Sequence, residues 1–424
     1  MRMLRKFFFI TILLFTIIVL FGVTISRADT ISQIQAKIDA ANTSRATLEK
    51  EIANYQDQLK VINDQANTLK NTIKSLDVST TKITKQVSLA QNNLNQTSYS
   101  IEDTSSKIQD KEQQINIGNI AIKNFLRQIN EADAKSFFEI MLSNQSITDF
   151  WNEVETTIQV QAKIGDQVAS TKDVKSSLEK AKADLEKKKK ELEDYTKQLA
   201  DQKQVLQSTK KDKTNLLTTT KNSEANYQKL LKDKLALKDA LDKEINAFET
   251  QIKMVVDPKS FPSAGKGILK WPVENVYITQ NFGKTSVSGR LYVSGTHNGI
   301  DFRAPIGTKV MSAGSGTVEG VGDTDPVCPG ASYGKWVFIR YDNGLASAYG
   351  HLSLITATAG QKVKAGDIVA YSGSTGYSTG PHLHMSVWAG QGVKVSTLKS
   401  TVCKGTYTIP MGDLKAYLDP LVYL

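Results

Sequence analysis

Residues 373–388 read GSTGYSTGPHLHMSVW, a glycine- and serine-rich turn followed by an apolar run that is typical of a β-strand. Because alternate residues of a strand point to the same face, His382 and His384 should project together while Leu383 points into a core. Two imidazoles on one face suit a metal ion, but a His-x-His pair is also common on ordinary surfaces. This stretch predicts a β-domain and a candidate metal site.

All four histidines of the chain lie between positions 297 and 384. His297 and Asp301 form an H-x-x-x-D pattern, and His351 follows a Tyr-Gly pair. Each pattern alone fits a surface, core or capping histidine. Their joint occurrence in one short region favours a zinc site, since catalytic zinc commonly takes three protein ligands and leaves a position for water.

The apolar periodicity changes to two after Gly267, where short runs alternate with turns rich in glycine and serine. Four such runs are Val276–Thr279, Gly316–Glu319, Trp336–Arg340 and Ile368–Tyr371. They predict an all-β domain over residues 268–424, which is long enough to bury its own core.

The motifs of this region resemble those of lysostaphin-like (LytM-type) zinc endopeptidases from about Trp271 to Trp388. The order and spacing of the motifs agree with the family, and only the loop Asp323–Ser332 is longer. The matching segments are His297–Asp301, Ala304–Thr308, Gly350–Ser353, Val363–Asp367, Gly373–Gly376 and Gly380–His384.

This resemblance implies a duplicated hybrid motif fold and a bound Zn²⁺ held by His297, Asp301 and His384. It also implies that His382 and His351 are catalytic histidines that do not bind the metal. Two neutral imidazoles and one carboxylate leave a net positive charge at zinc, which would lower the pKa of a bound water. The family cuts peptide bonds in bacterial peptidoglycan, so the expected substrate is peptidoglycan peptides.

Two other functions stay open. Some coiled-coil members of this family have lost their ligands and only activate a separate peptidoglycan amidase, and a helical spacer with a vestigial tail is a third interpretation. All five expected positions are present in this chain, which favours an enzyme.

Cys328 and Cys403 are the two cysteines of the chain, and both fall in the predicted β-domain. In an exported protein, two cysteines predict one disulfide, with free thiols as the alternative.

A 3.5-residue apolar repeat runs from Ile31 to Ile115, and a second runs from about Trp151 to Val255. Such repeats indicate a coiled coil. The segment between them is aromatic and off the repeat, which predicts one chain folding back on itself; a single long intermolecular coiled coil is the alternative. The region resembles that of secreted cell-division hydrolase regulators of the EnvC and PcsB kind. This implies a role as spacer or regulatory module in cell-wall remodelling or cell division, with a membrane division protein or transporter-like regulator as partner.

The N-terminus has the layout of a secretory signal: basic residues within Met1–Lys6, a charge-free run from Phe7 to Ile25, and Ser26-Arg27-Ala28. The run also has the length of a membrane anchor. Either interpretation places the rest outside the cytoplasm, secreted or anchored to the outer face of the cytoplasmic membrane and associated with the cell wall.

The sequence therefore predicts helical and β structure in separate domains. The segments are a signal peptide or membrane anchor (1–28), a coiled-coil helical hairpin with its tip near 137–151 (29–256), a linker (257–267) and a LytM-type peptidase domain (268–424). The net charge of +10 fits a lysine-rich solvated helix face. No basic cluster is interleaved with aromatic residues, so nucleic acid is not an expected partner.

Overall fold

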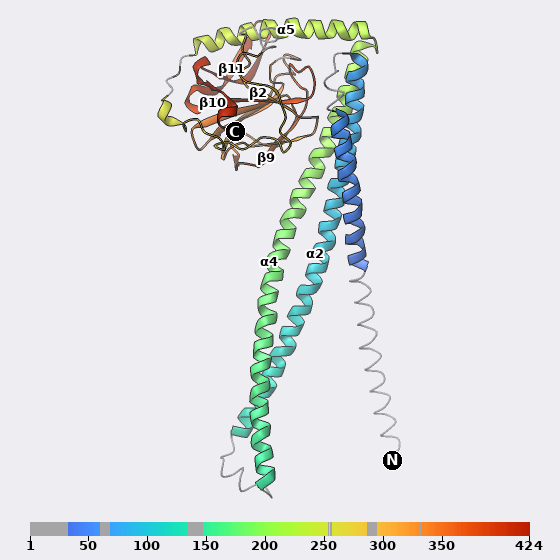
Figure 1. Cartoon of the computed structure of the whole chain (residues 1–424), viewed down its shortest axis with the longest axis vertical. Coiled ribbons are helices and arrows are strands. Elements are labelled where there is room, and N and C mark those ends of the chain that lie inside the picture. Colours follow the sequence, from blue (N-terminus) through green and yellow to red (C-terminus); the bar gives the residue numbers. More distant parts are fainter. Residues whose placement is uncertain are drawn as a thin grey trace. The chain divides into compact units, whose positions relative to one another are not determined.

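The computed structural model describes residues 33–59, 68–133, 147–252, 254, 257–285, 295–330 and 332–424. The predicted signal segment (1–28) and most of the predicted hairpin tip (137–146) lie outside the described residues. Long helices precede an antiparallel β-domain, which confirms the predicted fold class (Figure 1).

Two long helices, α2 (Leu69–Asp133) and α4 (Ile147–Thr220), run antiparallel to one another. Lys188 Nζ donates to Thr104 Oγ1 at 2.7 Å, and Lys182 pairs with Glu112 at 2.8 Å. Residue numbers that rise on one helix therefore fall on the other. This is the pairing expected of a chain that folds back on itself.

The first helical segment is not a continuation of α2, although the apolar repeat from Ile31 to Ile115 placed both in one arm of the predicted hairpin. Residues 33–59 form a separate helix that runs antiparallel to α2. Glu51 pairs with Lys85 at 2.8 Å, and Lys37 Nζ lies 5.2 Å from the ring centroid of Tyr99. The prediction of one continuous arm was wrong, because the same apolar spacing serves a helix that packs as a third member of the bundle.

The C-terminal part of the second repeat also forms a helix of its own, α5 (Glu224–Gln251). Lys221 and Asn222 take left-handed backbone conformations after α4, with φ of 49° and 54°. Glu224 then accepts a hydrogen bond from the first amide of α2, Leu69 N, at 2.8 Å. The apolar face of α5 packs against the β-domain, where Leu241 joins a cluster that includes Trp336.

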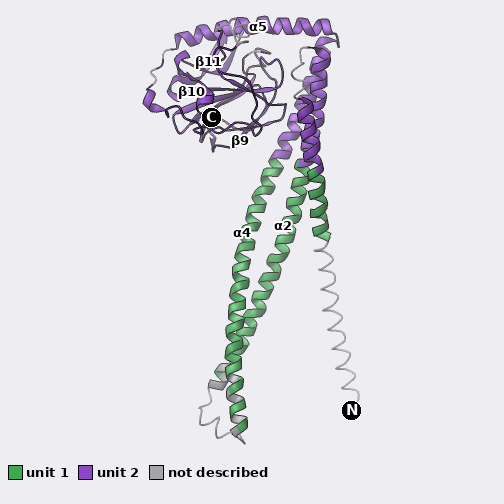
Figure 2. Cartoon of the chain, viewed as in Figure 1, with its two compact units in different colours: residues 1–46, 90–197 green, residues 47–89, 198–424 purple. Residues whose placement is uncertain are grey.

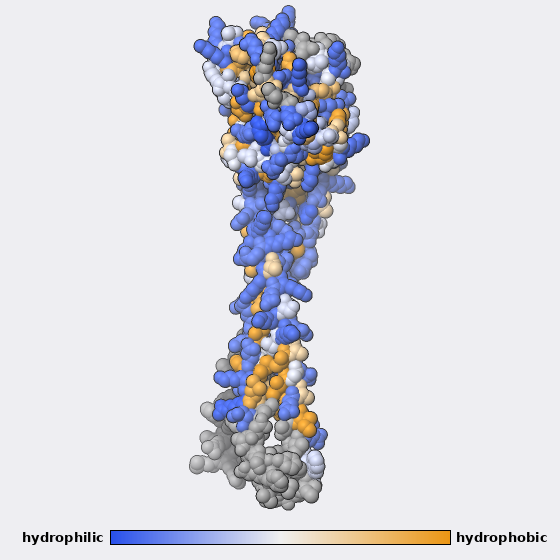
Figure 3. All heavy atoms as spheres, turned by 90° about the vertical axis from the view of Figure 1, so that its left-hand side faces the viewer, coloured by the Kyte–Doolittle hydropathy of each residue, from blue (hydrophilic) through white to orange (hydrophobic). Residues whose placement is uncertain are grey.

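The chain divides into two compact units (Figure 2). One comprises residues 1–46 and 90–197, and the other comprises residues 47–89 and 198–424. Helix α5 and the β-domain thus belong to the same unit. In the space-filling view the helices are mainly hydrophilic at their surface, as the lysine-rich sequence predicts, with apolar side chains gathered toward one end (Figure 3).

The β-domain contains one large antiparallel sheet with strand order β1-β2-β10-β6-β5-β4-β8, and β13 pairs with β10. A three-stranded sheet (β3-β9-β7) and a hairpin (β11-β12) complete the described strands. The strand bounds are β1 Ile278–Gln280, β2 Ile300–Arg303, β3 Lys309–Met311, β4 Gly316–Asp323, β5 Lys335–Tyr341, β6 Leu345–Gly350, β7 Leu352–Ile355, β8 Lys362–Val363, β9 Ile368–Ser372, β10 His382–Ala389, β11 Val393–Ser400, β12 Gly405–Gly412 and β13 Tyr417–Leu418.

The core of the domain is made by the inward side chains of these strands. Phe302, Val337, Leu383 and Val387 are fully buried in the main cluster, and Leu383 points inward as the strand alternation predicted. Short 3-10 helices occur at Pro258–Ser260, Gly390–Gly392, Leu414–Ala416 and Pro420–Val422. The described helices contain no stretch of sufficient length and hydropathy to span a bilayer.

A disulfide joins Cys328 and Cys403, with their Cα atoms 5.5 Å apart. It links the long loop between β4 and β5 to the turn between β11 and β12. Cys328 belongs to the buried cluster that includes Leu241 of α5, and the partly buried Cys403 packs against it.

Candidate metal centre

Strands β2, β10 and β6 bring the predicted site residues together. In the large sheet β10 lies between β2 and β6, and His384 is paired with Asp301 on one side and Gly350 on the other. His297 precedes β2 and forms an isolated bridge with Gly283. His351 follows Gly350 at the end of β6. Residues distant in sequence thus meet because of strand register.

The donor atoms of His297, Asp301 and His384 form a compact triangle. His384 Nδ1 lies 2.9 Å from Asp301 Oδ1, His297 Nε2 lies 3.1 Å from His384 Nδ1, and His297 Nε2 lies 3.3 Å from Asp301 Oδ1. Bonds of about 2.0–2.1 Å in a tetrahedral zinc site place neighbouring ligands about 3.3 Å apart. Two imidazoles and one carboxylate at these separations fit a zinc ion.

Gly299, in the His297–Asp301 motif, leaves room for the ring of His384. A Cβ atom at Gly299 would lie 2.6 Å from Cε1 and Nε2 of His384. The ring of His384 therefore packs directly on the backbone of the segment that joins His297 to Asp301, and any side chain at this position would displace it.

Backbone carbonyls fix the orientation of the other rings. His297 Nδ1 lies 3.0 Å from the carbonyl oxygen of Asn281, and His351 Nδ1 lies 2.9 Å from that of Thr375. His382 Nδ1 lies 2.8 Å from the carbonyl oxygen of Gly380. A carbonyl oxygen only accepts, so each Nδ1 carries the proton and each Nε2 keeps its lone pair.

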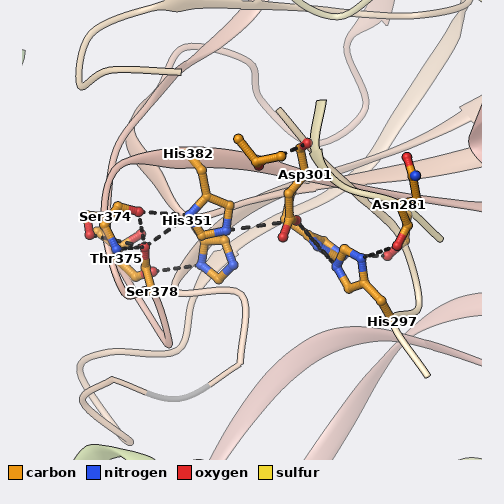
Figure 4. A network of polar contacts seen from close by, with 12 residues as sticks. Asn281, His297, Asp301, His351, Ser374, Thr375, Ser378 and His382 are labelled. Carbon is orange, nitrogen blue, oxygen red and sulfur yellow. Dashed lines mark hydrogen bonds and ion pairs between the residues drawn. The ribbon is translucent and has the colours of Figure 1, made fainter. Parts of the chain in front are cut away.

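His351 and His382 lie beside one another on one side of Asp301, and His297 lies on the other (Figure 4). The ring centroids of His351 and His382 are 4.6 Å apart, and His382 Nε2 is 3.9 Å from Asp301 Oδ1. His351 takes a left-handed conformation with φ of 59°, which is strained for this residue type. Its amide donates to the carbonyl oxygen of Tyr333 at 2.7 Å, which helps to hold this conformation.

The electrostatics of the cluster suit metal binding. Burial lowers the pKa of His384 and, with the neighbouring histidines, lowers that of His351 well below 6.5, so both rings are neutral at pH 7. Burial alone would raise the pKa of Asp301, but His382, His297 and His384 lower it well below 3.8. The centre therefore offers neutral imidazoles and an ionised carboxylate.

A cleft of about 600 Å³ contains all five of these residues. One wall is formed by a single face of α5, which sequence reasoning assigned to the coiled coil; its lining residues are Lys238, Asp242, Ile245, Asn246, Glu249 and Thr250. Their spacing of three and four along the helix was visible in the sequence, but nothing distinguished it from a coiled-coil seam.

Residues 295–396 match the model of peptidase family M23. The chain therefore carries a peptidase M23 domain, and the predicted family resemblance is confirmed. The M23 segment includes all five predicted site residues, from His297 to His384.

Characterised proteins are similar to this region of the chain. The peptidoglycan DD-endopeptidase ShyA of Vibrio cholerae is 34% identical over 177 residues, covering 42% of this chain and 39% of that protein. The DD-carboxypeptidase/endopeptidase Mpg of Neisseria meningitidis serogroup B is 41% identical over 88 residues, covering 21% of this chain and 19% of that protein.

The chain thus spans well under half of these curated relatives. Among solved structures, the catalytic domain of lysostaphin from Staphylococcus simulans is 28% identical, covering 34% of this chain and 90% of that one, with a TM-score of 0.26.

Proposed function

We propose that this chain is a zinc endopeptidase that hydrolyses peptide bonds in bacterial peptidoglycan. The single observation that carries the proposal is the triangle of His297, Asp301 and His384 with His351 and His382 beside it. The similarity to peptidoglycan DD-endopeptidases supports the choice of substrate. The presence of all five side chains in one cleft gives no support to a non-catalytic activator of an amidase.

The residues have distinct roles in this proposal. His297, Asp301 and His384 would hold the ion, and a bound zinc would supply a Lewis acid able to activate water and polarise a carbonyl. Nε2 of His382 and of His351 carries a lone pair because each Nδ1 donates to a carbonyl oxygen. One ring can therefore accept a proton from a water in the cleft and, once protonated, donate to the oxygen that becomes negative.

The test combines metal analysis with digestion of purified peptidoglycan. The wild-type chain should bind one zinc and release peptide fragments identified by mass spectrometry. His384→Ala should lose both metal and activity, whereas His351→Ala should keep the metal and lose activity. Fragments released equally by His384→Ala, or after chelation, would refute the assignment of the ligands.

We infer in addition that the helical region regulates the site rather than serving only as a spacer. The support is α5, whose face lines the cleft and whose Glu244 is held by the turn after β11. Glu244 accepts hydrogen bonds from Ser400 Oγ at 2.6 Å and from Thr401 N at 2.6 Å. Because α5 narrows the approach to the histidines, weaker docking should admit a large substrate more readily.

The variant Glu244→Gln should weaken the docking of α5 and raise kcat/KM on peptidoglycan at saturating zinc. Lys243→Gln, which changes the exposed neighbouring residue, serves as the matched control. Equal turnover of the wild type and Glu244→Gln would mean that the helical region is a spacer.

We also propose that the protein works outside the cytoplasm, secreted or held at the outer face of the membrane, and in cell-wall remodelling or division. The support is the signal-like pattern of residues 1–28 and the nature of the proposed substrate. A membrane-bound division protein or transporter-like regulator remains the expected partner of the helices. Fractionation of cells that express the tagged chain tests the location, and recovery in the cytoplasm would contradict it.

A further inference from the structure

The metal ligand His384 has a second polar partner on the side away from the metal. Its Nδ1 faces Asp301 and His297, while its Nε2 lies 2.9 Å from the hydroxyl of Ser386. Ser386 is two residues along β10 and fully buried. With Nδ1 as the ligand atom, Nε2 carries the proton and donates to Ser386 Oγ.

The hydroxyl of Ser386 leads to a second group of buried polar side chains. Tyr333 interacts with Ser386, Tyr417 and Asn298, and its ring centroid lies 5.7 Å from that of His384. Burial raises the pKa of both tyrosines, so each phenol keeps its proton and can accept one hydrogen bond while donating another.

The series of contacts ends on α5. Tyr417 donates its hydroxyl proton to Glu249 Oε1 at 2.8 Å, and Asn298 Nδ2 donates to Tyr417 at 3.4 Å. Glu249 is only 6% exposed. Contacts therefore lead from His384 through Ser386, Tyr333 and Tyr417 to a carboxyl oxygen on α5.

Such an arrangement has a physical consequence for the metal ligand. A histidine whose outer N–H donates to a polar chain is fixed in ring orientation and tautomer and is a more basic ligand. Hydrogen bonds in series also polarise one another in a low-dielectric interior. The terminal acceptor belongs to a different element, a helix that precedes the β-domain in sequence.

We propose that Ser386, Tyr333, Tyr417 and Glu249 form a positioning chain that holds His384 as a metal ligand, so that the docking of α5 sets the metal affinity of the centre. The inference rests on the metal site of the proposed function, but not on the hydrolysis of peptidoglycan. Coupling of this kind is reciprocal: if docked α5 strengthens metal binding, bound metal must strengthen the docking of α5.

The decisive variant is Tyr417→Phe in the full-length chain, which removes one hydroxyl and keeps the ring that packs 4.9 Å from Trp388. Zinc affinity is measured by competition with a chromophoric chelator. Loss of a direct hydrogen-bond partner of a metal ligand typically costs 10–100-fold in metal affinity or activity, so we expect at least a tenfold loss of zinc affinity in Ser386→Ala. Tyr417→Phe removes a hydroxyl further along the series, so its loss should be smaller but more than twofold.

The matched control is Tyr341→Phe. This substitution also removes a buried hydroxyl, one that is hydrogen-bonded to Tyr349 at 2.6 Å and is not part of the chain. It should leave zinc affinity within twofold of the wild type. The second readout is hydrogen exchange of the α5 amides, which zinc should slow in the wild type and leave unchanged in Tyr417→Phe.

Wild-type zinc affinity in Tyr417→Phe, or an equal loss in Tyr341→Phe, would overturn the proposal. Slowing of α5 exchange by zinc in both the wild type and Tyr417→Phe would also overturn it. Neither measurement uses peptidoglycan. A chain that shows the coupling but cleaves no murein peptide would disprove the proposed function and leave this inference intact.

Discussion

Lys82 is a buried charged side chain whose replacement should change the stability of the folded chain. It lies on α2 and is fully buried, and its Nζ has no hydrogen-bond partner among the described residues. Ser79 Oγ and Gln86 Oε1, about one turn to either side, have none among them either. A buried ammonium without a partner destabilises the folded state.

The size of the effect follows from the pKa of Lys82, which burial lowers from 10.5 to about 8. At about 1.4 kcal/mol per pH unit, the charged side chain costs about 3 kcal/mol of folding free energy near neutral pH. Between about pH 8 and pH 10.5 the unfolded chain binds this proton more tightly than the folded chain, so stability should rise with pH.

The test is urea unfolding of Lys82→Met and the wild type at neutral and alkaline pH, monitored by the helical circular dichroism signal. The variant should be about 3 kcal/mol more stable near pH 7, and the gain should shrink toward pH 10. Lys85→Met is the matched control, since Lys85 is partly exposed and pairs with Glu51. A Lys82→Met chain that is no more stable than the wild type would refute the reasoning.

Three further predictions concern the unit that contains the metal centre. Burial raises the pKa of Glu249 from 4.5 to about 7, so the free energy of unfolding of this unit should fall as the pH rises from 4.5 to about 7. Glu249→Gln should flatten that part of the pH–stability curve. The disulfide closes a loop between residues 75 apart, so the double variant Cys328→Ala with Cys403→Ala should lose about 2–4 kcal/mol in denaturant unfolding; an unchanged midpoint would contradict this. Leu241→Ala should cost about 2–5 kcal/mol and speed hydrogen exchange of α5, whereas the more exposed Leu235→Ala should do neither.

The sequence was most informative about residue types that are rare in this chain. Four histidines left few ways to build a centre, and the alternation around Leu383 correctly gave the face on which His382 and His384 lie. The roles of the individual histidines stay predictions until metal binding and activity are measured. The network beyond His384 was not predicted, because serine and tyrosine are common and their meeting depends on strand register.

The helical region was harder to predict for a physical reason. The apolar spacing of residues 33–59 and of α5 is the same whether a helix packs in a coiled coil, a three-helix bundle or on a sheet. Periodicity identifies the buried face of a helix but not its partner. Asn222, between α4 and α5, was a weak local signal for a helix end, since asparagine takes the left-handed conformation more often than most residues other than glycine.

The pairing of His384 with both Asp301 and Gly350 limits how this centre can change over evolution. Inserting one residue into β10 would exchange His384 for its apolar neighbours and abolish the centre in a single step. A change of length in a loop between strands leaves this register intact, and the loop that carries Cys328 is tied to the turn between β11 and β12 by the disulfide. New preferences for substrate should therefore arise by lengthening or shortening loops, while the strands beneath them stay constant in length.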